Sequence, residues 1–339
     1  MFENILTPGK LLDEKGRLVQ SGYAFCQAKT YDRADIRAGR LRIKEWDYYC
    51  FGDEDYAVAM TVADNSYVLS VSVSVLDFKH FGFITKRKTG LMPRGKLELP
   101  CSCETGDVSV ERGGVKMSFV NDGGKRALEC EFKKYRGKDD FACRIELDKP
   151  RGDNITVATR FANPKQFRYG TDINCLTGVG WFRIGEKRHE FESGMGCLDW
   201  GRGVLPYRSV RYRSSLSAIV DGKPFGLNLG YGFGEPSASE NVVFVDGTAN
   251  KLNNATFDIP YTRNELDYLK PWRIADDENR LGMMFYPMVD MTERKTVGMR
   301  TTDLHRVFGK FYGQVTTDDG TIVTVEDKLG FAERADNKW

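Results

Sequence analysis

Apolar and polar residues alternate along short stretches of this chain. The clearest stretch runs from Tyr67 to Leu76, where apolar residues are separated by serines: Leu69, Val71, Val73 and Val75 alternate with Ser70, Ser72 and Ser74. Successive side chains of a β-strand point to opposite faces of its sheet. The pattern therefore predicts a strand with one apolar face and one face of small polar side chains.

Clusters of turn-forming residues separate many stretches of this kind. Glycine, which adopts positive φ at little steric cost, occurs 35 times and is spread through the chain. Glu111–Gly114 and Asn121–Gly124 have the composition of hairpin turns. Helical periodicity is scarce, and Pro271 limits any helix that starts near Thr262 to a short one. Many short strands with few helices predict an all-β fold built of sandwiches or barrels.

The length of the chain predicts two domains. Its 339 residues exceed the length of one typical domain, which is roughly 150 residues. The most loop-like segment near the midpoint is Lys149–Asn154. We therefore expect an N-terminal β-barrel domain at residues 1–150 and a C-terminal β-barrel domain at residues 151–339.

The charges of the chain nearly cancel. Lys and Arg number 50 against 48 Asp and Glu, a net charge of +2, which argues against a nucleic-acid partner. No apolar run approaches the roughly 18 residues that span a bilayer, so we expect no membrane span. Met1–Lys10 lacks the pattern of a signal peptide. We therefore expect a cytoplasmic protein whose eight cysteines remain free thiols.

Several well-known chemistries lack their motifs here. The chain has no phosphate-binding P-loop and no G-x-S-x-G nucleophile turn, and the glycines of Gly230–Gly234 have the wrong spacing for a dinucleotide loop. Its three histidines, His80, His189 and His305, lie far apart, and Cys101-x-Cys103 has no second cysteine pair with zinc spacing. Hydride transfer, phosphoryl transfer and zinc hydrolysis are therefore disfavoured. We expect no metal and no cofactor.

The segment from Arg42 to Tyr49 combines acidic and aromatic residues in an unusual way. In an extended chain Glu45 and Asp47 share a face with Ile43, whereas Trp46 lies on the opposite face. Either a bulge turns the acids of an outer strand towards water, or the acids point towards an interior. In the second case Glu45, Trp46 and Asp47 are candidate ligand-binding residues.

The segment from His189 to Gly203 is the strongest candidate for chemistry. It is rich in glycine and holds a histidine, three carboxylates, an arginine and a tryptophan; the candidates are His189, Glu192, Asp199 and Arg202 as catalytic residues and Trp200 as a ligand-binding residue. A carboxyl group in a tryptophan-lined pocket and an imidazole are suited to general acid–base catalysis. The alternative is a glycine-rich interdomain loop whose charges pair with one another.

Other candidates depend on weaker patterns. Trp181 and Tyr231 could line a pocket, although aromatic residues of β-proteins usually belong to the core. In the run from Arg208 to Arg213, Arg208, Val210 and Tyr212 alternate with Ser209, Arg211 and Arg213. This alternation is typical of a strand with a solvated face rather than of a basic arm.

Several motifs resemble the bacterial domain-of-unknown-function family DUF2804. These are Lys44–Tyr49, Asp199–Pro206, Asn228–Gly232, Glu240-Asn241, Phe308–Gly313 and Gly330–Glu333, so that the resemblance runs over nearly the whole chain. More remotely, the chain is similar to tandem lipocalin-like proteins of the carotenoid hydratase group. That resemblance implies two lipocalin-like β-barrels in tandem, with pocket residues supplied by the interdomain groove and by the second barrel. No catalytic residue can be aligned with that group one by one.

We expect the chain to bind a hydrophobic or amphiphilic small molecule; its oligomeric state is left open. The first hypothesis is a cofactor-free hydratase, lyase or isomerase, in which Asp199 or Glu192 protonates the substrate, His189 relays the proton, Arg202 steadies negative charge and Trp200 excludes water. The second hypothesis is a non-catalytic carrier or sensor of a lipid-like ligand. A third, a carbohydrate-binding β-sandwich, would need exposed aromatic residues on one flat face.

Overall fold

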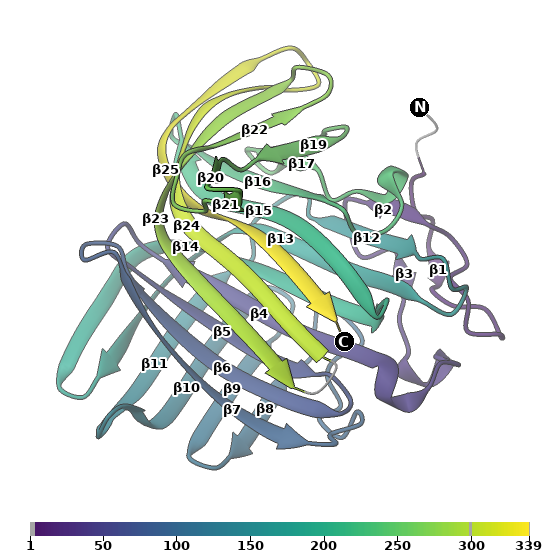
Figure 1. Ribbon diagram of the computed structural model, residues 1–339, viewed down its shortest axis with the longest axis horizontal. Helices are drawn as coiled ribbons and strands as arrows, with labels where there is room; N and C mark the ends of the chain where they lie inside the picture. Colours follow the sequence, from purple (N-terminus) through teal and green to yellow (C-terminus); the bar gives the residue numbers. More distant parts are fainter. Residues whose placement is uncertain (1–3, 298–299, 339) are drawn as a thin grey trace.

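A computed structural model describes residues 4–297 and 300–338 of the chain, and most of them form two large β-sheets (Figure 1). The described residues contain no α-helix, only short 3₁₀ helices at Arg33–Asp35, Arg40–Arg42 and Pro236–Ala238. The predicted all-β fold is confirmed. None of these helices is long and apolar enough to cross a membrane.

The first sheet holds twelve strands, all paired antiparallel. In order of pairing they are β7 (Gly82–Leu91), β6 (Val68–Asp77), β5 (Tyr56–Asp64), β4 (Ile43–Gly52), β14 (Lys187–Val204), β13 (Phe167–Ile184), β11 (Asp139–Asp148), β10 (Lys125–Arg136), β9 (Val115–Asn121) and β8 (Val108–Arg112), while β12 (Ile155–Arg160) pairs with β13 and with β2 (Gly22–Ala24). The sheet curls, and the inside of the curl holds the larger apolar core of the molecule.

The second sheet holds nine strands. In order of pairing they are β18 (Thr248–Lys251), β17 (Val242–Val245), β16 (Lys223–Tyr231), β15 (Arg208–Val220), β25 (Ile322–Lys338), β24 (Arg300–Thr316), β23 (Leu281–Val297), β22 (Trp272–Asp276) and β19 (Ala255–Asp258). Two small sheets pair β1 (Gly9–Lys10) with β3 (Lys29–Thr30) and β20 (Tyr261–Thr262) with β21 (Glu265–Leu266). The second sheet has a separate apolar core on its own inner face.

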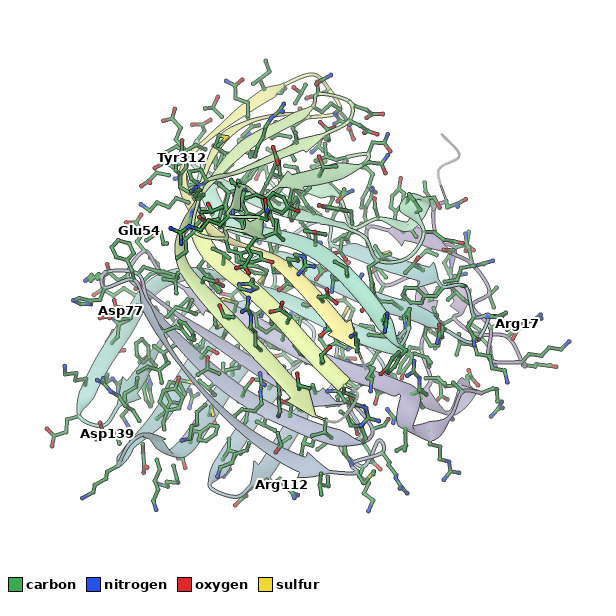
Figure 2. The ribbon with its side chains drawn as sticks, in the orientation of Figure 1. Arg17, Glu54, Asp77, Arg112, Asp139 and Tyr312 are labelled. Atoms are coloured by element: carbon green, nitrogen blue, oxygen red, sulfur yellow. The ribbon has the colours of Figure 1, made fainter. Side chains whose placement is uncertain are left out.

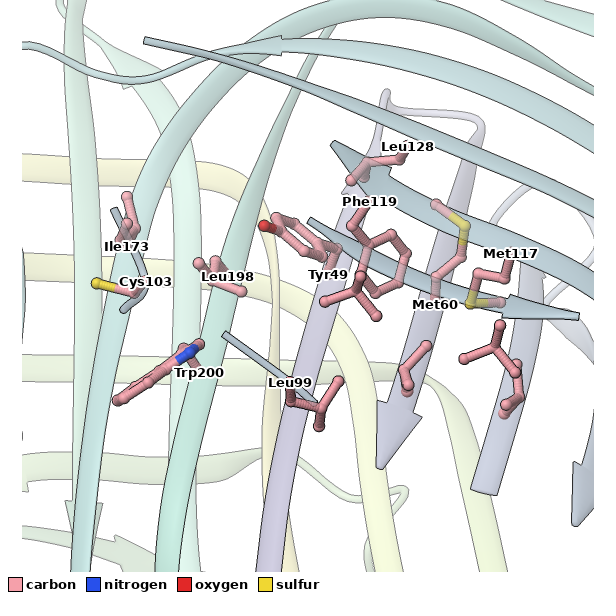
Figure 3. Packing of buried hydrophobic residues seen from close by; sticks show 14 of the residues in the cluster. Tyr49, Met60, Leu99, Cys103, Met117, Phe119, Leu128, Ile173, Leu198 and Trp200 are labelled. Atoms are coloured by element: carbon pink, nitrogen blue, oxygen red, sulfur yellow. The ribbon is translucent and has the colours of Figure 1, made fainter. Parts of the chain in front are cut away.

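The alternation along β6 places its two faces as the sequence predicts. Leu69, Val71 and Val73 are buried in the first core. The same core holds Tyr49 and Met60, which Figure 3 labels. The serines of the same strand face the second sheet instead. Charged side chains such as those of Arg112 and Asp139 lie at the periphery of the molecule (Figure 2).

The outer face of the first sheet packs against the second sheet. A small apolar cluster joins them, with Tyr48, Cys50 and Cys197 on the first sheet and Phe308 and Phe331 on the second. Strands β23, β24 and β25 cross β4 and β5 at this contact (Figure 1). The space between the sheets is filled at this cluster, and it is hollow where the first sheet presents smaller side chains.

The change from one sheet to the other falls between Val204, where β14 ends, and Arg208, where β15 begins. Lys149–Asn154, expected to be a domain boundary, connects β11 to β12 within the first sheet. The division into domains at residue 150 and the closure of each half into a barrel stay predictions, since a sheet boundary and a domain boundary need not coincide.

Candidate functional site

A cavity of about 470 Å³ lies between the two sheets; we call it the inter-sheet cavity. It is hollow because the first sheet presents only small side chains over part of its outer face: Ala59, Thr61, Ser70, Ser72 and Ser74. Strands β15, β23, β24 and β25 form the opposite wall. The polar face that the alternation of β6 predicts is therefore a wall of this cavity.

Strand register sets charged residues at both edges of this hollow region. Asp199, Tyr48, Thr61, Ser72 and Arg87 lie opposite one another across β14, β4, β5, β6 and β7. The row begins with a carboxylate and ends with a guanidinium group, and Tyr48 and the small side chains of Thr61 and Ser72 lie between. Both charged ends reach across to the second sheet.

Two ion pairs link the sheets at the ends of this row. Asp199 pairs with Arg213 of β15, and both side chains are almost fully buried. Arg87 pairs with Glu293 of β23, where the guanidinium Nη2 lies 2.6 Å from Oε2. This second pair is about one-third exposed. The cavity thus lies between the buried Asp199–Arg213 pair and the partly exposed Arg87–Glu293 pair.

Asp199 is the best-positioned carboxylate of the cavity. The indole Nε1 of Trp46 donates a hydrogen bond of 2.9 Å to its Oδ1, and Arg213 donates to Oδ2. Burial acts to raise the pKa of Asp199, but Arg213, Arg211 and Arg168 outweigh it and hold the pKa below the usual range. The group is therefore ionised and has a fixed orientation.

Asp172 of β13 lies directly opposite Asp199 and receives a second hydrogen bond from Arg213. Asn228 of β16 donates to its other oxygen at 3.2 Å. Burial raises the pKa of Asp172 to about 7, with Asp199 adding to the rise. One guanidinium group therefore serves two carboxylates, and only Asp199 of the two lines the cavity.

A second cluster of charges continues from this pair. Glu240 accepts a hydrogen bond of 2.7 Å from Arg168 on one oxygen and one of 2.7 Å from Arg211 on the other. These arginines, with Arg213, hold its pKa below the usual range although burial acts to raise it. Arg211 and Arg213 face the first sheet, so the interpretation of this run as a solvated face is wrong for both residues.

The family model of a domain of unknown function, DUF2804, matches residues 3–339. The chain belongs to this family. A search among curated proteins finds no match.

Two solved structures share the fold of this DUF2804 chain. A putative AttH from Nitrosomonas europaea is 13% identical with a TM-score of 0.54, and the match covers 91% of this chain and 98% of that one. Kievitone hydratase from Nectria haematococca is 13% identical with a TM-score of 0.53, over 98% of this chain and 96% of that one. At this identity the likeness shows the fold alone. The predicted membership of the DUF2804 family is confirmed, and the predicted remote similarity is confirmed at the level of the fold.

Asp199 and Trp46 are the two sequence-predicted site residues of the DUF2804 chain that line the inter-sheet cavity. His189 lies ten positions from Asp199 on the same strand, a separation of roughly 33 Å at the rise of a β-strand. Its Nε2 lies 2.7 Å from Asp53 Oδ2 instead. Glu192 is exposed. The expected proton relay between His189 and Asp199 is therefore not assembled.

Arg202 and Trp200 lie on the opposite face of β14 from Asp199. Arg202 is fully buried and its Nη1 lies 2.8 Å from Asp47 Oδ1, while its guanidinium group stacks 4.2 Å from the centroid of the Trp200 ring. Trp200 belongs to the first core (Figure 3). These residues stabilise the interior of the first sheet rather than the cavity.

The acids of β4 point to an interior, which settles the choice left open by the sequence. Glu45 accepts a hydrogen bond of 2.7 Å from Tyr31 and pairs with Arg33. The register of β4 with both neighbouring strands shows no bulge. Glu45 and Asp47 therefore face the first core, away from the inter-sheet cavity.

Trp181 and Tyr231 also lie elsewhere. Trp181 is half-buried with the Arg188 guanidinium carbon 4.1 Å from its ring centroid. Tyr231 stacks on Tyr212, with ring centroids 4.5 Å apart, and lines a smaller cavity of about 280 Å³. Sequence reasoning missed Asp172, Arg168, Arg211 and Arg213, because their partners come from strands far away in the chain.

Proposed function

We propose that the inter-sheet cavity binds an amphiphilic small molecule and that the protein acts on it as a cofactor-free, hydratase-like enzyme. One observation carries this proposal: a buried, ionised Asp199 carboxylate lines the cavity and is oriented by Trp46 and Arg213. The neighbouring lining mixes apolar side chains such as Met291 and Phe83 with hydroxyl groups. Such a lining suits a ligand that has both apolar and polar parts.

The state of Asp199 suggests its role. For addition of water to a double bond conjugated with a carbonyl group, Asp199 would take a proton from water as the water oxygen bonds to the β-carbon. The protonated carboxyl would then return the proton to the α-carbon, so that water is added overall. A carboxylate with a lowered pKa is a weak base, but its protonated form is a strong acid suited to the second step. Asp199 therefore first accepts a proton, whereas the hypothesis from the sequence made Asp199 or Glu192 the group that first protonates the substrate.

The second candidate function is a carrier or sensor without catalysis. The specific observation in its favour is the pairing of charges in the cavity wall. Arg306 donates to Glu333 at 2.7 Å, and Arg87 pairs with Glu293, as Asp199 does with Arg213. Paired charges favour stable binding over proton transfer, so an experiment must separate the two functions.

The first test is native mass spectrometry of the purified protein, followed by organic extraction and identification of any bound molecule. An enzyme is expected to convert the extracted molecule, with a loss in rate of about 10²- to 10⁴-fold in Asp199→Asn. A carrier would bind the molecule within a few-fold in both proteins and leave it unchanged. Asp53→Asn, which breaks the contact with His189, is the control and should behave as wild type. An empty protein that also fails to bind apolar dyes would contradict both functions.

A further inference from the structure

We infer that the ligand of the inter-sheet cavity carries an anionic group of the carboxylate class and that Arg211 binds this group. The inference rests on the proposed function, because it assigns the substrate class of the same cavity.

Arg211 and Phe233 line both the inter-sheet cavity and the smaller cavity of about 280 Å³. The two side chains therefore form the partition between these spaces. Phe233 lies between Gly232 and Gly234, whose φ angles of +82° and +92° favour glycine. Its ring packs against Phe161, with ring centroids 4.9 Å apart. A ligand that extends from one cavity towards the other passes the Arg211 guanidinium group.

The guanidinium group of Arg211 is only partly compensated. Its Nη2 donates to Glu240 at 2.7 Å, and no other hydrogen bond of this side chain is formed among the described residues. Glu240 serves Arg168 as well, so one carboxylate faces two guanidinium groups. The Arg211 side chain is 14% exposed, which leaves its remaining N–H donors access to the cavities.

The other arginines near the cavity are better compensated. Arg213 pairs with two carboxylates, those of Asp172 and Asp199. Asp172 also makes a longer contact with Arg168, at 3.8 Å. Arg87 and Arg306 each pair with one carboxylate: these are Glu293 and Glu333 respectively. Since Asp199 is already neutralised by Arg213, its repulsion of a ligand anion at Arg211 is weakened. Arg294 and Lys295 also line the cavity but are exposed to water. Among the arginines on the buried part of the wall, Arg211 is therefore the one whose charge an added carboxylate can best balance.

Apolar residues continue from Arg211 along the cavity wall. Ala335 lies opposite it on β25, and Leu304 lies opposite Ala335 on β24. Both residues line the inter-sheet cavity. An anion at Arg211 would therefore have its hydrocarbon part over Ala335 and Leu304. This arrangement matches an amphiphilic acid better than a neutral lipid or a sugar.

The test compares two probes with the same twelve-carbon chain, dodecanoate with an anionic head group and dodecanol with a neutral one, by equilibrium dialysis against the purified protein. Wild type is expected to bind the acid at least about tenfold more tightly than the alcohol, because only the acid forms a charge-assisted hydrogen bond with Arg211. Arg211→Gln should bring the two dissociation constants within about threefold. Arg208→Gln is the matched control, because Arg208 is exposed and lies on the other face of the same strand.

A variant with the opposite effect makes the test sharper. Glu240→Gln removes the carboxylate that occupies Arg211 and should tighten binding of the acid without changing binding of the alcohol. If Arg211→Gln fails to fold because Glu240 loses a partner, Arg211→Gln with Glu240→Gln restores the charge balance and should also lose the preference.

The outcomes separate the two proposals. If wild type binds neither probe, the small-molecule function and this inference both fail. If wild type binds the acid and the alcohol equally, the cavity still binds small molecules but the inference of an acidic ligand is overturned. A preference for the acid that survives in Arg211→Gln, or in the double variant, removes the assignment to Arg211.

Discussion

Two aspartates that face each other across β13 and β14 have opposite protonation behaviour. Asp199 accepts hydrogen bonds from Trp46 and Arg213, whereas Asp172 accepts them from Arg213 and from the neutral amide of Asn228. Both are buried, so each carboxylate depends on a cation to remain ionised. Because Asp199 has more positive charge around it, the proton of this pair resides on Asp172 when one binds.

We predict a pH dependence of stability that originates at Asp172. Burial raises its pKa from the usual 3.8 to about 7, so the folded state binds this proton more tightly than the unfolded state does. The contribution of Asp172 to the free energy of unfolding is therefore fully present below its usual pKa and is lost as the pH rises through about 7. Urea unfolding of wild type and Asp172→Asn, at pH values between about 4 and 8 in steps of about one pH unit, measures this contribution.

The variant should show a flatter profile than wild type over this window. Asp258→Asn, at an exposed carboxylate of β19, is the control and should follow wild type. Parallel profiles for wild type and Asp172→Asn would mean that the folded and unfolded states bind this proton equally well.

At the scale of the strand, the contact between Trp46 of β4 and the backbone of β14 depends on one glycine. Gly201 lies opposite Trp46, and a Cβ added to it would lie 2.0 Å from Cζ2 of the indole ring. Gly201→Ala must therefore displace Trp46, the residue that orients Asp199. We expect a loss of about 1–3 kcal/mol in the free energy of unfolding, as for other overpacked sites.

Chemical denaturation measures this loss, and Gly282→Ala is the matched control. Gly282 lies on β23 with nothing within 4 Å of an added Cβ. Its substitution should change stability by less than about 1 kcal/mol. If the two variants are equally stable, Trp46 can move aside at no cost, and its position at the cavity is not determined by Gly201.

Patterns within one strand could be predicted from the sequence, and partners across strands could not. The alternation of Ser70, Ser72 and Ser74 gave the correct two faces of β6, because the period of a strand is a local property. The candidate site residues His189 and Asp199 lie close together in sequence, but both belong to the single extended strand β14, which places them far apart in space. The same limit hid the Asp199–Arg213 pair, since it forms between strands of different sheets.

At the scale of the whole molecule, the cavity is a consequence of how two sheets meet. Aromatic residues such as Phe308 and Phe331 fill the contact on one side, while the small residues of β5 and β6 leave it hollow on the other. A larger side chain in the hollow part should therefore be tolerated. Its effect would be on binding rather than on folding.

We predict that Ser72→Leu blocks ligand binding at little cost in stability. The new side chain would occupy the centre of the row between Thr61 and Arg87. Dodecanoate binding should weaken at least about tenfold, while the free energy of unfolding should change by less than about 1 kcal/mol because empty space is filled. Ser109→Leu, on an exposed position of β8, controls for added apolar surface. Unchanged binding in Ser72→Leu would place the ligand outside this cavity.

The two ion pairs that link the sheets differ in burial, and this difference predicts where the cavity opens. Removing one partner of the buried Asp199–Arg213 pair should cost about 3–5 kcal/mol, because a buried charge is left behind. The Arg87–Glu293 pair is about one-third exposed, so a double-mutant cycle should give a coupling of only about 0.2–1 kcal/mol that weakens in high salt. The sheets should therefore separate first at the end formed by β7 and β23.

Hydrogen exchange checks this order. The backbone amides of β7 should exchange faster than those of β14, and Arg87→Gln should accelerate exchange in β7 alone. Equal acceleration of both strands would mean that the sheets separate as one rigid unit, with no preferred entrance for the ligand.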